Sequence, residues 1–126
     1  MKARVQYTID FTFKAKDELL FTYLVEPFNL KVWFADKVEV SKDIYTFNWK
    51  GSSEKAKLVK EIMKKKVVYK WIERENEEFL SFEIDIDPVT GSTLLIISDF
   101  DDEGQEEAAG LLWENTISKL KRAIGG

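Results

Sequence analysis

Apolar and polar residues alternate at the start of the chain, over residues 4–13. The apolar positions share one face of an extended segment and are Val5, Tyr7, Ile9, Phe11 and Phe13. A period of two, built from β-branched and aromatic side chains, is typical of a strand with one buried face. The pattern therefore predicts a half-buried strand over residues 4–13.

The spacing of apolar residues then changes from two to that of a helix. Residues 15–25 place leucines and a tyrosine at helical intervals, with two acidic residues near the start, where the helix dipole favours negative charge. Pro27 cannot lie inside this helix, but proline suits a first helical turn. We therefore expect one helix over residues 15–25 and a second, short helix from Pro27 to Trp33.

Strand-like segments with short connections fill the middle of the chain. The expected strands are 37–41, 44–49, 54–63, 66–72, 79–87 and 92–100. Connections of two to six residues join antiparallel neighbours, because a parallel pair needs a crossover of a dozen residues or more. The middle of the chain is thus predicted to be an antiparallel meander.

The last segment, from Asp101 to Ile124, is predicted to be one long helix. Its apolar stripe follows helical spacing and consists of Trp113, Ile117, Leu120 and Ile124. Acidic residues crowd its beginning and basic residues its end, which complements the helix dipole. The acidic cluster Asp99, Asp101, Asp102 and Glu103 is interpreted as part of this helix start. Its spacing lacks the loop of a calcium site, so no metal site is predicted.

These elements predict an α+β fold in which a curled sheet is wider than the helix that covers it. The first strand can bury its aromatic face by joining an edge of the six-stranded meander, and the helical pair would carry the chain to the other edge. A seven-stranded antiparallel sheet curls and keeps one apolar face, which only the final helix is long enough to cover. A helix is about 10 Å wide, much narrower than such a sheet. The rest of the concave face must be filled by large side chains or remain a pocket.

Seven aromatic residues are the candidates for the wall of such a pocket: Trp33, Phe47, Trp49, Tyr69, Trp71, Phe82 and Trp113. One interpretation is a cavity of a few hundred Å³ for an apolar or planar ligand. The other is a filled core, because each buried aromatic side chain removes roughly 150–250 Å² from water. The sequence leaves both interpretations open.

The composition narrows the chemistry. The chain has 126 residues, no histidine and no cysteine, so it lacks the side chains that perform most acid–base, nucleophilic and transition-metal chemistry near neutral pH. No catalytic residue, metal ligand or cofactor is therefore predicted. A net charge of −4 argues against a nucleic-acid partner.

No signal-peptide pattern or membrane-length apolar run is visible in the sequence. We expect a single domain over residues 1–126, in a soluble cytoplasmic protein of bacterial type without an integral membrane segment.

The order of elements and several local patterns resemble the START-like, or SRPBCC, superfamily of helix-grip proteins. The patterns are Phe21-Thr22-Tyr23-Leu24 before Pro27 and Trp33, Tyr45-Thr46-Phe47-Asn48-Trp49-Lys50-Gly51, Val67-Val68-Tyr69-Lys70-Trp71, Gly91-Ser92-Thr93-Leu94-Leu95, and Trp113. The strands with the F-x-W-x-G and V-x-Y-x-W patterns are most similar to the subfamily that activates the ATPase of the heat-shock protein Hsp90. The resemblance implies the helix-grip arrangement, a curled sheet wrapped around the C-terminal helix.

The resemblance also implies candidate functions. The first is the binding of a small hydrophobic, aromatic or lipid-like ligand between the sheet and the C-terminal helix. The second is a co-chaperone-like domain that binds a protein partner, and the third is an enzyme of the cyclase or hydratase type. The enzyme would need a buried carboxylate, arginine or tyrosine hydroxyl in the pocket, and the sequence shows no such convergent polar set.

Overall fold

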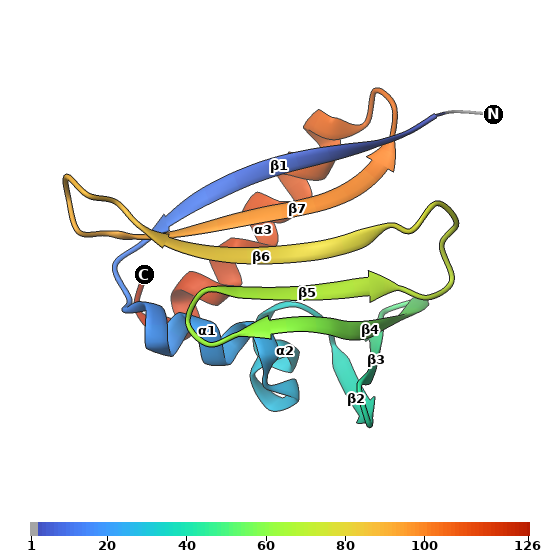
Figure 1. The fold of residues 1–126 in the computed structure, drawn as a ribbon, viewed down its shortest axis with the longest axis horizontal. Helices are drawn as coiled ribbons and strands as arrows, with labels where there is room; N and C mark the ends of the chain where they lie inside the picture. Colours follow the sequence, from blue (N-terminus) through green and yellow to red (C-terminus); the bar gives the residue numbers. More distant parts are fainter. Residues whose placement is uncertain (1–2) are drawn as a thin grey trace.

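A computed structural model describes residues 3–126; Met1 and Lys2, the first two residues of the predicted domain, lie outside the described residues. The fold is α+β, as predicted, with three helices and one sheet (Figure 1). In chain order the elements are β1 (Arg4–Phe13), α1 (Asp17–Val25), α2 (Pro27–Trp33), β2 (Lys37–Ser41), β3 (Ile44–Trp49), β4 (Ser52–Ile62), β5 (Lys66–Trp71), β6 (Phe79–Ile86), β7 (Thr93–Asp102) and α3 (Glu106–Ile124).

The seven strands form one antiparallel sheet in the order β1-β7-β6-β5-β4-β3-β2. Strands β2 to β7 are the predicted meander, and β1 joins its far edge beside β7. Helices α1 and α2 carry the chain from one edge strand to the other, which confirms the expected route (Figure 1). In this register Tyr7 of β1 lies opposite Asp99 of β7.

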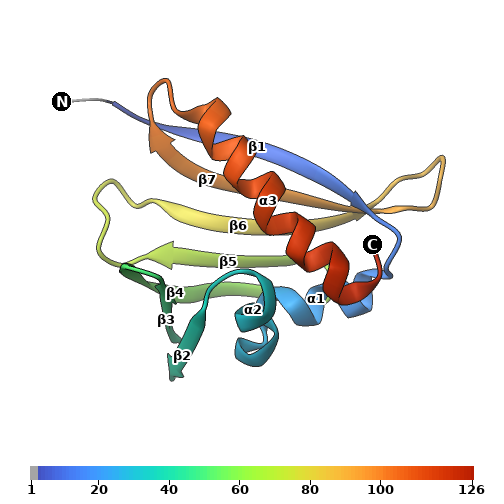
Figure 2. The same ribbon diagram turned by 180° about the vertical axis from the view of Figure 1, so that it is seen from behind.

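Helix α3 crosses the sheet on the same side as α1 and α2 (Figure 2). Its buried residues include Trp113, Ile117 and Leu120, so the predicted apolar stripe faces the sheet. Gly125 ends the helix in the left-handed conformation, with a φ of 88°, which glycine adopts at little cost.

The start of α3 differs from the prediction. The helix begins at Glu106, and Asp101 and Asp102 belong to β7. Strand β7 extends this far because β1 pairs with its whole length, ending with Arg4 opposite Asp102. The Arg4 guanidinium also donates from Nη1 to Oδ1 of Asp102 at 3.0 Å. The acidic cluster therefore does not start the helix, and its carboxylates are free for other contacts.

Two tyrosine side chains fasten helix α1 to the sheet. Tyr45 and Tyr69 donate their hydroxyl hydrogens to the carbonyls of Val25 and Leu24, at 3.0 and 2.6 Å. These carbonyls lie in the last turn of α1, where no further helical N–H can reach them. The two bonds satisfy buried polar groups on both sides and hold α1 over one end of the concave face.

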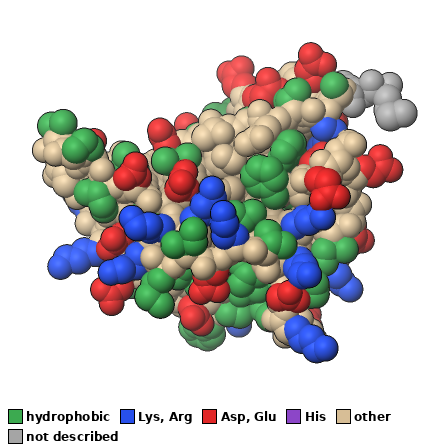
Figure 3. Space-filling model, in the orientation of Figure 1, with side chains coloured by type: hydrophobic (Ala, Val, Ile, Leu, Met, Phe, Trp, Pro, Cys, Tyr) green, Lys and Arg blue, Asp and Glu red, His purple; other side chains and the backbone are tan. Residues whose placement is uncertain are grey.

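The opposite face of the sheet is open to solvent. Figure 3 shows apolar side chains on this face interspersed with lysine, arginine, aspartate and glutamate. The lysine run 64–66 lies at the turn between β4 and β5, and its last member, Lys66, begins β5. Within residues 3–126, no helix is both long enough and apolar enough to cross a membrane.

Candidate functional site

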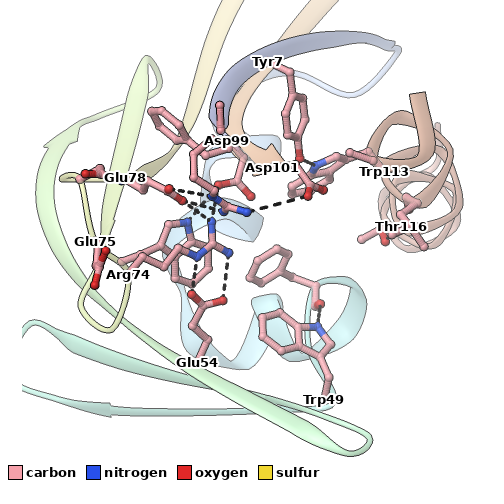
Figure 4. A pocket seen from close by; sticks show the side chains of 18 residues that line it. Tyr7, Trp49, Glu54, Arg74, Glu75, Glu78, Asp99, Asp101, Trp113 and Thr116 are labelled. Atoms are coloured by element: carbon pink, nitrogen blue, oxygen red, sulfur yellow. Dashed lines mark hydrogen bonds and ion pairs between the residues drawn. The ribbon is translucent and has the colours of Figure 1, made fainter. Parts of the chain in front are cut away.

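A pocket of about 800 Å³ opens on the concave side, at the end of the sheet away from α1. Its walls come from the first part of α3, the start of β1, the end of β7, the ends of β3 and β5, the start of β4, and the β5–β6 connection. Figure 4 shows its side chains converging from these elements on a common space. The volume lies in the range of small-molecule sites, roughly 300–1,000 Å³.

Four aromatic rings form the apolar wall: Phe34, Trp49, Trp71 and Trp113. Phe34 follows α2 and stacks on Trp113, with ring centroids 6.0 Å apart and planes inclined by 19°. The ring of Trp49 meets Phe34 edge-on at 5.5 Å. Phe34 therefore joins the two tryptophans into one continuous aromatic surface.

The indole N–H groups of these tryptophans are all bonded within the protein. Trp49 donates to the Phe34 carbonyl at 2.7 Å, and Trp113 donates to the hydroxyl of Tyr7 at 2.8 Å. Trp71 donates to Oδ1 of Asp99 at 3.0 Å. These bonds fix the rings in place, so a ligand would meet their carbon surfaces.

The polar wall is organised around Arg74, in the β5–β6 connection. Its guanidinium donates two bonds to Glu54, at 2.5 and 3.0 Å, and longer bonds to Glu78 and Asp99 at 3.2 and 3.4 Å. The same group lies over the ring of Trp71, 4.5 Å from its centroid. Arg74 is thus held by three carboxylates and one indole face (Figure 4).

Glu78 connects this network to a second arginine. Arg4 donates to both oxygens of Glu78, at 2.9 and 2.8 Å, and Glu78 is only 2% exposed. The hydrogen bonds from Arg4, and then from Arg74, hold the pKa of Glu78 below its ordinary value against the effect of burial. Both guanidinium groups therefore already have carboxylate partners.

Asp99 is a second buried carboxylate of the pocket, with 8% of its surface exposed. Burial raises its pKa to about 6, although the charge of Arg74 and the hydrogen bond from Trp71 act in the opposite direction. Tyr7, opposite Asp99 in the sheet, has its pKa raised to about 12 by burial and by the charge of Asp99. At neutral pH the pocket thus holds a largely ionised Asp99 and a protonated Tyr7 hydroxyl.

The chemistry of these groups is hydrogen bonding, ion pairing and proton exchange at a carboxylate. Within residues 3–126, no three acidic side chains are grouped to hold a metal ion. The residues thus provide a polar end and an aromatic end of one space, an arrangement that suits a ligand with both characters.

The seven aromatic residues selected from the sequence divide into two groups. Trp49, Trp71 and Trp113 line the pocket. The others pack in the core and are absent from its wall; Trp33 is 2% exposed, and Phe47, Tyr69 and Phe82 are fully buried. The two interpretations of the sequence thus apply to different ends of the same concave face, one filled and one open.

The polar set of the pocket and Phe34 were not predicted from the sequence. The set consists of Arg4, Tyr7, Glu54, Arg74, Glu78 and Asp99, drawn from the three strands β1, β4 and β7 and from the β5–β6 connection. One signal was available, because the alternation in β7 that turns Leu95 and Ile97 inward also turns Asp99 inward. The arginines gave no such signal, since most of their partners lie far away in the sequence: Glu78 is 74 positions from Arg4, and Glu54 and Asp99 are 20 and 25 positions from Arg74.

A comparison with family models identifies the family of this chain. The family model described as a START-like superfamily domain matches residues 1–126. The comparison with curated proteins gave no match.

Among solved structures, the chain resembles the Aha1 dimer of Colwellia psychrerythraea at 18% identity, covering 95% of this chain and 96% of that one, with a TM-score of 0.78. BfR322 of Bacteroides fragilis matches at 27% identity, with coverages of 98% and 92% and a TM-score of 0.66. MLL2253 of Mesorhizobium loti matches at 16% identity, with coverages of 94% and 95% and a TM-score of 0.74. The fold, with a curled antiparallel sheet behind a C-terminal helix, and the match over its whole length place this chain in the START-like superfamily.

Proposed function

We propose that this protein binds a small, largely apolar or aromatic molecule in the pocket between α3 and the sheet. The observation that carries the proposal is the pocket itself: about 800 Å³ of space bounded by three tryptophans and Phe34. Aromatic walls with a few placed polar groups are characteristic of small-molecule sites.

The fixed orientation of the lining tryptophan rings supports this function. Since each lining indole N–H is bonded to the protein, the aromatic wall keeps its shape without a ligand. A wall that is already in place spares a ligand the entropy of ordering side chains on binding. The polar end, held by Arg74 and its carboxylates, is fixed in the same way.

Thermal denaturation in the presence of a library of lipids and aromatic metabolites tests the proposal. A compound that binds only the folded protein raises the midpoint temperature of unfolding in a concentration-dependent way. At a hundredfold excess over Kd, the free energy of unfolding increases by about 2.7 kcal/mol. We expect some aromatic compounds to stabilise the wild type. The same compounds should not stabilise Trp49→Ala, since Trp49 lines the pocket. A library without hits, or hits unaffected by this change, would contradict the proposal.

Asp99 favours a second candidate, an enzyme that shapes its ligand and moves a proton. A pocket carboxylate with a pKa of about 6 can accept or donate a proton near neutral pH. Mass spectrometry of each hit after incubation with the protein tests this candidate. Conversion by the wild type and none by Asp99→Asn would support it, and an unchanged ligand would leave binding as the function.

The co-chaperone-like role remains a prediction from the family resemblance. It would be supported by copurification with a chaperone ATPase and by stimulation of that ATPase. An ATPase rate that does not respond to this protein would remove it.

A further inference from the structure

We propose that the ligand of this pocket carries a protonated amine, which binds between the carboxylates at the polar end and the aromatic rings. This inference rests on the proposed binding function and specifies the chemical class of the ligand. It concerns an apolar or aromatic molecule with a primary, secondary or tertiary ammonium group.

The charge of the pocket lining favours a cationic ligand. Two guanidinium groups and five carboxylates line the pocket, the latter being Glu54, Glu75, Glu78, Asp99 and Asp101. The two arginines are not available to an anion, because Arg4 pairs with Glu78 and Asp102, and Arg74 with Glu54, Glu78 and Asp99. A cleft lined by an excess of one sign of charge concentrates ligands of the opposite sign.

The aromatic wall of the pocket also favours a cationic ligand. The lining tryptophans use their N–H groups internally, so they present ring surfaces, and the face of an indole ring attracts a cation. The pocket already contains one such contact, where the Arg74 guanidinium lies 4.5 Å from the ring centroid of Trp71. The rings of Trp49 and Trp113 have no such partner among residues 3–126.

The surroundings of Asp99 leave room for a positive charge beside this carboxylate. Its two side-chain hydrogen bonds, from Trp71 and Arg74, both reach Oδ1, and the bond from Arg74 is long, at 3.4 Å. Burial raises the pKa of Asp99 despite these contacts, so its negative charge is only partly compensated. A ligand ammonium beside Asp99 would provide the missing positive charge and a strong, charge-assisted hydrogen bond.

Three probes with the same ring system separate this inference from the proposed function. Naphthylethylamine is cationic, naphthylethanol is neutral, and naphthylpropionate is anionic at neutral pH. Isothermal titration calorimetry of the whole chain should give about tenfold tighter binding for the amine than for the alcohol, and the weakest binding for the propionate. Added salt should weaken the binding of the amine and leave the affinity for the alcohol unchanged.

Two variants localise the effect to the pocket. Asp99→Asn keeps an acceptor for Trp71 but removes the charge, so it should reduce the preference for the amine about tenfold while preserving the affinity for the alcohol. Asp101→Asn, at a more exposed lining position, should reduce the preference by a smaller factor. Asp10→Asn removes one charge from the outer face of β1 and should change neither affinity.

Each result decides a different point. If the alcohol binds and the amine binds no more tightly than the alcohol, the inference is overturned and the proposed function stands. An amine preference that survives in both pocket variants would also overturn it. Failure of all three probes to bind would contradict the pocket as a binding site for aromatic molecules, and the inference with it.

Discussion

The two ends of the concave face differ although they share one sheet and one covering helix. At the α1 end, Phe47, Tyr69 and Phe82 are fully buried, and their rings lie 5.8 to 6.3 Å apart. At the other end, the pocket leaves about 800 Å³ between α3 and the sheet. Helices α1 and α2 account for the difference, because they lie beside α3 over one end of the sheet only (Figure 2).

Polar groups show the same contrast. At the filled end, the tyrosine hydroxyls are bonded to carbonyls of α1, so each polar group serves to fasten one element to another. At the open end, the indole N–H groups are bonded to Tyr7, Asp99 and Phe34, and an ionic network stands beside them. Phe34, in contact with rings of both ends, marks the boundary. Large aromatic side chains therefore serve stability at one end and create a surface at the other.

The largest expected effect comes from truncating a ring at the filled end. Phe82→Ala should reduce the free energy of unfolding by about 3–5 kcal/mol, because Phe82 is fully buried against Trp33 and Tyr69. Trp49→Ala, at the half-buried pocket wall, should cost about 1–2 kcal/mol. Urea unfolding of both variants measures the difference, and equal losses would show that the two ends do not differ in packing.

The charge of Asp99 should make the open end sensitive to pH. Since the folded protein raises the pKa of Asp99 from 3.8 to about 6, it holds this proton more tightly than the unfolded chain does. The contribution of Asp99 to stability therefore falls as the pH rises from about 4 to above 6, by about 3 kcal/mol in total.

The test is the difference in unfolding free energy between the wild type and Asp99→Asn, measured from pH 3.5 to 7. Contributions of other groups, including Glu78 with its lowered pKa, are shared by both proteins and cancel in the difference. A difference that stays constant across this range would mean that Asp99 is not buried as described.

A smaller loss is expected from removing one hydroxyl at the filled end. Tyr69→Phe deletes the bond to the Leu24 carbonyl, and leaving that buried acceptor without a partner should cost about 1–2 kcal/mol. Tyr23→Phe is the control, because the Tyr23 hydroxyl forms no hydrogen bond within residues 3–126. Equal stabilities of the two variants in urea would show that the Tyr69 hydroxyl does not fasten α1.

The smallest effect on stability is expected from two exposed leucines of α3, only one of which lines the pocket. Leu112 lines the pocket and Leu111 does not, yet both are exposed, at 68% and 58%. Changing either to Gln should alter the unfolding free energy by less than about 0.5 kcal/mol. In calorimetry, only Leu112→Gln should reduce the affinity for a pocket ligand. An equal reduction by Leu111→Gln would mean that the ligand binds elsewhere.

The arrangement of the fold was predictable because it depends on local periodicity and connection length. Alternation in β1 and helical spacing in α3 were visible within each segment, and short connections implied an antiparallel meander. The boundary of α3 was predicted too early because acidic residues suit both a helix start and a strand end. The pairing of β1 with β7, a contact between distant segments, decides between the two.

The candidate site was only partly predictable. Its tryptophans were visible as large residues on strands, but nothing local distinguished Trp49 of the pocket from Phe47 of the core on the same strand. That distinction depends on where α2 and Phe34 pack. The ionic network was invisible for the same reason, since Arg4 and Glu78 are 74 positions apart.

The most direct test of the open end uses the indole N–H signals of the four tryptophans in a proton–nitrogen correlation spectrum. Titration with naphthylethanol should shift the signals of Trp49, Trp71 and Trp113, which line the pocket, and leave that of Trp33, buried at the filled end, in place. Single Trp→Phe variants assign the signals. A shift of Trp33 equal to the others, or no shift at saturating ligand, would contradict the account of one filled and one open end.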